Sequence, residues 1–183
     1  MKDMDPITYQ LDHLADFLFA LGLSQINRRL IVKYQDLKLS YPSLLYIHDL
    51  YRNDICLKYV QLTDLSDNFN ILKPINKIIQ EFEQKKRGKN DGLVELRDLV
   101  TKLRSLCESD FSKSLKSEVR DVYIAHNDLM KRTAITVDMD QLNDNFKQIV
   151  ELYNRACIIW GATPILLDFS QRDTIETMLK DLS

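Results

Sequence analysis

The sequence predicts an all-α protein, folded as one domain, an antiparallel helical bundle over residues 1–183. Apolar residues recur three and four positions apart in almost every long segment, which is the period of one face of an α-helix. The 183 residues include only four glycines and four prolines, too few for the many tight turns of an all-β fold. Hydrophobic residues make up 45% of the chain and charged residues 28%, a balance typical of a chain that buries a core.

Eight helices are expected, and the short links between them favour antiparallel neighbours. They cover, to within a few residues, positions 6–22, 24–37, 42–62, 71–82, 93–106, 112–131, 142–160 and 170–182. Asp5 and Pro6 begin the first helix, because a capping residue followed by proline suits a first turn. Gly22 is expected to end that helix and Ser24 to cap the second, while Gly161 ends the helix at 142–160.

Three segments are expected to separate helices. Residues 63–70 (TDLSDNFN) and 85–92 (KKRGKNDG) are rich in turn-forming and charged side chains, so both are predicted to be surface loops. Residues 133–137 (TAITV) are mostly β-branched, which predicts a short extended link or ribbon. Asp138 and Asp140 follow this link and are expected to cap the next helix.

Composition restricts the classes of function. The net charge of −2 gives no overall attraction to nucleic acid, so any RNA contact must come from a local basic patch. Cys56, Cys107 and Cys157 stand singly, which predicts buried thiols in a reducing cytoplasm rather than disulfides or a metal site. No cofactor is indicated. The acidic start at residues 1–6 is unlike a signal peptide, and no apolar run approaches the roughly 20 residues that span a membrane.

One segment carries a constellation typical of catalysis, residues 118–128 (EVRDVYIAHND). Arg120 is followed directly by Asp121 and six positions later by His126. His126 falls on the apolar seam of the predicted helix, and Arg120 flanks that seam. Since six residues of helix separate the two side chains, they lie about 120° apart around the axis and about 9 Å apart along it. One helix therefore cannot easily direct both at one phosphate, whereas two copies related by a two-fold axis can.

This segment resembles the core motif of the abortive-infection branch of the HEPN superfamily. The string VRDVYIAHND is similar to the R-D-x-Y-x-A-H-x-D pattern of that branch, and residues 60–75 (VQLTDLSDNFNILKPI) are similar to its Thr-Asp loop and Asn-capped helix. The resemblance covers about residues 44–160. It implies a helical HEPN fold, an active cleft at a homodimer interface, and RNA cleavage in antiviral defence or a toxin system, in which an antitoxin or other partner protein is expected. Some HEPN toxins carry a tyrosine three residues after the histidine, where a partner enzyme modifies them; here the residue is Leu129.

The chemistry of RNA cleavage needs these residue types. Attack by the 2′-hydroxyl requires a proton acceptor and a proton donor, and histidine can serve as either near neutral pH. The planar guanidinium of arginine stabilises charge on the phosphoryl oxygens, so no metal is required and the product is a 2′,3′-cyclic phosphate. The expected catalytic residues are Arg120, His126 and Asp121, with Asp121 orienting Arg120 or His126. The expected substrate-binding residues are Tyr123, Asp128, Lys131 and Arg132.

Other interpretations stay open at this point. His126 can also be a hydrogen-bonded core histidine, and Arg120 can pair on the surface with a neighbouring carboxylate. Lys131 and Arg132 also suit the C-terminal end of a helix, where basic residues are favoured. His13 and His48 are expected to be structural, and the run at residues 52–54 (RND) is expected to be a charged helix face. The alternative function is a catalytically inactive HEPN-like helical module that binds a protein or RNA partner.

Overall fold

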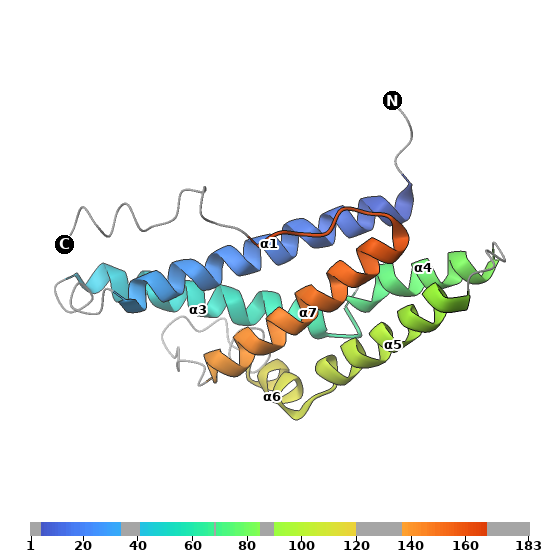
Figure 1. Ribbon diagram of the computed structural model, residues 1–183. Coiled ribbons are helices and arrows are strands. Elements are labelled where there is room, and N and C mark those ends of the chain that lie inside the picture. The colour runs from blue at the N-terminus through green and yellow to red at the C-terminus, as the bar shows by residue number, and fades with distance from the viewer. Residues whose placement is uncertain (1–4, 34–40, 68, 85–89, 120–136, 168–183) are drawn as a thin grey trace.

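The computed structural model describes residues 5–33, 41–67, 69–84, 90–119 and 137–167 (Figure 1). Within these ranges the chain forms six helices and no strand, which confirms the all-α prediction. The helices are α1 (Pro6–Lys33), α3 (Pro42–Thr63), α4 (Leu72–Gln84), α5 (Asn90–Cys107), α6 (Asp110–Val119) and α7 (Met139–Trp160). No helix in this part of the chain is long and apolar enough to cross a membrane.

The helices pack as a layered bundle (Figure 1). α1 and α3 lie side by side and antiparallel, and Ser24 Oγ of α1 donates to Asp54 Oδ2 of α3 at 2.7 Å. α4 and α5 form an antiparallel pair, joined by an ion pair between Arg97 and Glu83 at 2.7 Å. α7 runs diagonally across the bundle, and its Tyr153 hydroxyl donates to the carbonyl of Leu11 at 2.8 Å. α6 is a short helix that packs against α3.

All six helices contribute to one apolar core. Its members include Leu18 of α1, Tyr59 of α3, Ile75 of α4, Leu103 of α5, Leu115 of α6 and Tyr153 of α7, each at most 2% exposed. Burying a side chain of this size stabilises the fold by about 1.5–3 kcal/mol relative to leaving it in water. The arrangement of the helices, and thus the position of any site on them, is therefore set by packing in this core.

The first helix does not end near Gly22, as the sequence analysis expected. α1 continues without a break to Lys33, so the predicted first and second helices are one. Ser24 is 7% exposed and its hydroxyl donates to the carbonyl of Ala20 at 3.1 Å as well as to Asp54. A serine that bonds within its helix and to a neighbouring helix has no need to act as a cap, and burial of Gly22 and Ser24 against α3 keeps the helix continuous.

The second predicted loop is also shorter than expected. α5 begins at Asn90, so the end of the segment 85–92 is helical, while residues 85–89 lie outside the described residues. Gly92 lies where α5 approaches two neighbours: a Cβ there would meet Ile159 of α7 at 3.5 Å and Phe82 of α4 at 3.6 Å. Packing against these two helices therefore supports helical structure that composition alone did not predict.

The last described helix begins and ends as predicted. Asp138 accepts hydrogen bonds from the backbone N–H groups of Asp140 and Gln141 at 3.0 Å, which is an N-cap. Gly161 has φ 87°, the left-handed conformation that glycine adopts at the end of a helix. The predicted extended link is described only at Val137, and residues 133–136 and the predicted final helix at 170–182 lie outside the described residues.

Candidate functional site

None of the predicted site residues lies in the part of the chain that the structure describes. Arg120, His126 and Asp121, predicted as catalytic, fall within residues 120–136, and so do the predicted substrate contacts. These contacts are Tyr123, Asp128, Lys131 and Arg132. What the structure does describe is the helix that leads into this segment, the loop that holds that helix, and the charged residues nearby.

α6 is the described start of the helix that was predicted over residues 112–131. Leu115 and Val119 are 2% and 1% exposed, so the apolar seam is buried as far as it is described. Ser112 and the Tyr59 hydroxyl of α3 are hydrogen bonded at 3.2 Å, and that hydroxyl also accepts from Asn145 Nδ2 of α7 at 3.3 Å. α3 thus bonds α6 directly, and α7 bonds the same tyrosine; the described part of α6 stops one residue before Arg120.

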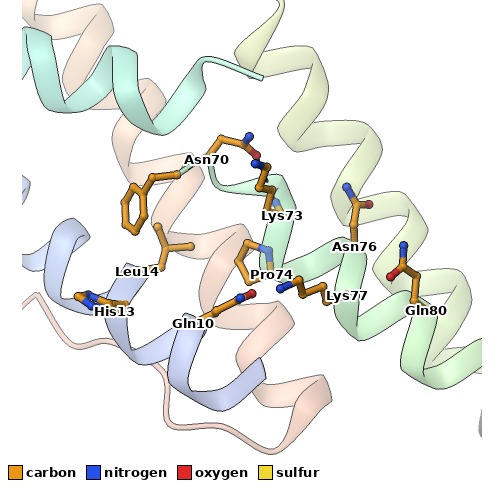
Figure 2. A pocket seen from close by; sticks show the side chains of 10 residues that line it. Gln10, His13, Leu14, Asn70, Lys73, Pro74, Asn76, Lys77 and Gln80 are labelled. Carbon is orange, nitrogen blue, oxygen red and sulfur yellow. Dashed lines mark hydrogen bonds between the residues drawn. The ribbon is translucent and has the colours of Figure 1, made fainter. Parts of the chain in front are cut away.

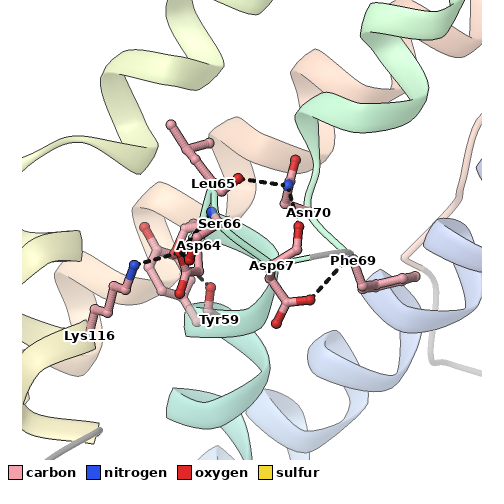
Figure 3. A network of polar contacts seen from close by, with 9 residues as sticks. Tyr59, Asp64, Leu65, Ser66, Asp67, Phe69, Asn70 and Lys116 are labelled. Carbon is pink, nitrogen blue, oxygen red and sulfur yellow. Dashed lines mark hydrogen bonds and ion pairs between the residues drawn. The ribbon is translucent and has the colours of Figure 1, made fainter.

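The predicted loop between α3 and α4 is a second anchor of α6 (Figure 3). Lys116 of α6 donates to Asp64 Oδ1 at 2.5 Å, and the same oxygen accepts from the backbone N–H of Ser66 at 3.0 Å and its hydroxyl at 2.6 Å. Burial raises the pKa of Asp64, but the hydrogen bonds from Lys116 and Ser66 outweigh this effect and lower its pKa to about 2. The carboxylate is therefore ionised and bound to α6 at any physiological pH.

The second half of this loop fixes the start of α4. Asn70 Oδ1 accepts from the backbone N–H groups of Leu72 at 3.1 Å and Lys73 at 3.2 Å, which confirms the predicted Asn cap. Its Nδ2 donates to the carbonyl of Asp67 at 2.8 Å. The Thr-Asp loop and the Asn-capped helix, on which part of the resemblance depends, therefore form one hydrogen-bonded unit that contacts α6.

The structure brings together a pair of arginines on α1 and α3 that the sequence did not predict. The hydrogen bonds Ser24–Asp54 at 2.7 Å and Asn27–Tyr51 at 3.3 Å show that moving forward along α1 means moving back along α3. This register brings Arg28 to the turn of α3 that contains Arg52. Both arginines are half-buried rather than exposed.

The run at residues 52–54 was expected to be a charged face. In the structure Arg52 is half-buried, and Asp54 accepts from Ser24 of α1 and pairs with Lys58, so part of this face packs against α1. The register that the hydrogen bonds reveal is a tertiary property, so no local signal in the sequence could have identified the pair.

Charges of both signs surround these arginines. Burial lowers the pKa of Arg28, and repulsion by Arg52 lowers it further, while Cys56 and Asp140 of α7 act in the opposite direction. Burial raises the pKa of the Cys56 thiol to about 11, with opposing effects from Arg52 and Arg28 and a smaller raising effect from Glu118. Cys56 therefore lies within electrostatic reach of both arginines and of Glu118 in α6. Glu118 is two residues before Arg120 in the sequence.

A separate cavity of about 650 Å³ lies between α1 and α4 (Figure 2). Its lining includes His13 of α1 and, on successive turns of α4, Lys73, Lys77 and Gln80. His13 was expected to be structural, but it is exposed here and packs edge-on against Tyr9 with ring centroids 5.4 Å apart. The cavity lies on α4, the helix that Asn70 caps. Among the described residues, no three histidine, cysteine, aspartate or glutamate side chains gather as a metal site would require.

Comparisons with protein-family models, with curated proteins and with solved structures found no match to this chain.

Proposed function

We propose that this protein is a metal-independent endoribonuclease of a defence or toxin-type system, active at a cleft between two copies of the chain. The observation that carries the proposal is the string Arg120-Asp121…His126, preceded by the Thr-Asp loop and Asn-capped helix at the spacing of the abortive-infection HEPN pattern. An all-helical bundle is the architecture that this pattern requires, and the described helices agree with it.

The proposed chemistry divides the work between two side chains. His126 takes the proton from the 2′-hydroxyl or delivers one to the leaving 5′-oxygen, which a group titrating near neutral pH can do. Arg120 binds the phosphoryl oxygens as negative charge builds on them. Asp121 orients these two groups, and the contacts to the RNA come from Tyr123 and its downstream polar neighbours.

The anchoring of α6 supports this assignment. A catalytic side chain must be held to within about half an ångström of its working position, which requires a rigid supporting element. α6 is held by the Lys116–Asp64 ion pair, by the hydrogen bond between Ser112 and Tyr59, and by two buried apolar residues. A helix secured in this way gives the following residue, Arg120, a defined starting point.

The test compares wild-type protein with three variants on fluorescently labelled single-stranded RNA in EDTA. His126→Ala and Arg120→Ala are each expected to slow cleavage by about 10²–10⁴-fold, and Arg120→Lys to restore little of it. His13→Ala is the matched control, since it removes an exposed histidine on α1 and is expected to cleave normally. Products should end in a 2′,3′-cyclic phosphate. Equal cleavage by wild type and His126→Ala contradicts the proposal. Light scattering that shows a monomer at tens of micromolar contradicts the cleft between two copies.

A second candidate function is a catalytically inactive helical module that binds a partner protein. It is favoured by an exposed apolar face on the first half of α3, where Tyr46 is 59%, Leu45 46% and Leu50 42% exposed. Exposed apolar side chains that gather on one face are typical of an interaction surface. In a co-expression toxicity assay this alternative predicts that Leu45→Lys abolishes toxicity while His126→Ala leaves it unchanged.

A further inference from the structure

The most unusual feature of the described helices is the approach of two arginines in a half-buried position. The α1–α3 register places Arg28 level with the turn that carries Arg52, and the two guanidinium groups repel each other. Desolvated like charges are unfavourable, so a fold retains them only where another requirement keeps them. Asp140 of α7 attracts Arg28, but this effect is weaker than the repulsion by Arg52. Among the charges of the described residues, Arg52 therefore has the largest effect on Arg28.

Buried polar atoms near this pair also lack hydrogen-bond partners among the described residues. Among the residues that the structure describes, the buried Nε of Arg28 has no hydrogen-bond partner. One turn before it on α1, Gln25 is 8% exposed, and one turn after Asp140 on α7, Asn143 is 3% exposed. Gln25 Nε2 and Asn143 Oδ1 have no hydrogen-bond partner within the described part of the chain. Buried polar groups are nearly always hydrogen bonded, so an exception requires an explanation, of which a bound water or ion is one.

The pair also lies close to the entrance of the proposed catalytic segment. Both arginines act electrostatically on the Cys56 thiol, and so does Glu118 near the end of α6. Glu118 precedes Arg120 by two residues. A positive site formed by α1 and α3 therefore adjoins the point at which the chain enters the Arg120–His126 string.

We propose that Arg28 and Arg52 form a phosphate-binding pair that holds the backbone of single-stranded RNA beside the Arg120–His126 segment. This inference rests on the proposed endoribonuclease function. Two guanidinium forks side by side match the oxygens of a phosphodiester, and a bound phosphate cancels the repulsion between them. The pair binds and positions substrate, while the proton transfers belong to His126.

The experiment measures RNA binding without cleavage, in the His126→Ala background, by fluorescence anisotropy with labelled single-stranded RNA. Arg28→Met and Arg52→Met keep the apolar stem and remove the charge, and each is expected to weaken binding about tenfold or more. Each should also reduce the slope of log K against log salt by about 0.7, the value for one lost phosphate contact on a single strand. Arg104→Met is the matched control, because it removes an exposed arginine on α5, and it should bind as its parent does.

Thermal unfolding separates a binding role from a structural one. If the pair exists to bind phosphate, Arg28→Met relieves repulsion and melts at the same temperature as its parent or higher. A lower melting temperature combined with unchanged RNA affinity overturns the inference, as does a His126→Ala protein that binds no RNA. Should either Met variant fail to fold, Arg28→Lys and Arg52→Lys carry the test, and unchanged affinity in both overturns it.

The two proposals fail in different ways. Cleavage that is insensitive to His126→Ala, together with weakened binding by the arginine variants, rejects the nuclease and leaves the phosphate pair standing. Cleavage that depends on His126, together with unchanged binding by the arginine variants, rejects the pair and leaves the nuclease standing.

Discussion

Replacing Asp64 with asparagine tests how firmly the α3–α4 loop holds α6. The side chain is 11% exposed, and its Oδ1 accepts from Lys116 of α6 and twice from Ser66. Asparagine has nearly the same shape and keeps an oxygen for Ser66, so Asp64→Asn removes mainly the charge. The expected effect is a loss of the electrostatic bond to Lys116 without a cavity.

The magnitude follows from the pKa of the carboxyl group. A lowering of this pKa from 3.8 to about 2 corresponds to about 2 kcal/mol of unfolding free energy at neutral pH. For a protein of this size that is a loss of about 4–8 °C in melting temperature. Because the folded pKa is the lower one, this stability is fully present above pH 3.8 and is lost as the pH falls toward about 2. Asp64→Asn should therefore differ most from wild type at neutral pH and least near pH 2.

Urea unfolding of wild type and Asp64→Asn across this pH range measures the difference. Asp144→Asn is the matched control: its ion pair with Lys147 has a similar N–O distance of 2.9 Å, but the two side chains are 66% and 67% exposed. Exposed pairs contribute little, so this control should change stability little at any pH. A loss in Asp64→Asn that is equally large at pH 2 and at pH 7, or additive with that of Lys116→Met, would refute the electrostatic explanation.

Two further predictions concern glycines and cysteines. Gly161→Ala should destabilise the protein by about 1–2 kcal/mol, because φ 87° strains any L side chain although the space is open. Gly92→Ala in α5 should stabilise the protein slightly in the same urea assay. Equal effects of the two substitutions contradict the backbone argument. Burial raises the pKa of all three cysteine thiols, to about 11 for Cys56 and about 12 for Cys107. These thiols and that of Cys157 should resist an aromatic disulfide reagent at mildly alkaline pH, and all three should react after unfolding. Rapid labelling of any of the three in the native protein contradicts their burial.

Sequence periodicity predicted the helical class because the apolar spacing within each segment indicates a helix without reference to the rest of the chain. It also predicted ends at which the cap is local, such as Asp138 and Gly161 of α7. It failed at Gly22 and Ser24, where local residues indicated a break and packing against α3 kept the helix intact. Tertiary contacts override weak local signals, and these contacts join residues about 30 positions apart in the chain.

One part of the candidate site could be predicted from local sequence, and the other part depends on tertiary contacts. The Arg120–His126 string is a local pattern and could be found from the sequence; its geometry stays a prediction, since these residues lie outside the described part of the chain. The Arg28–Arg52 pair is the reverse case. The two arginines are far apart in sequence, and each alone has the ordinary pattern of a charged helix face. Only the register between α1 and α3, set by Ser24 and Asp54, brings them together.

The two ends of the bundle differ in a way that bears on function. Near the start of α1, Trp160 and Phe82 pack with ring centroids 6.1 Å apart, and the Trp160 indole reaches Thr8 at 3.4 Å. Toward the other end of α1 the interior holds Gln25, and Arg28 faces Arg52. Unsatisfied polar groups and like charges lower stability, and the apolar core offsets that cost. Natural proteins depart from such packing rules mainly at functional sites. The departure here includes Arg28 and Arg52, which act electrostatically on Cys56 together with Glu118 in the last described turn of α6, and the predicted motif begins two residues after Glu118.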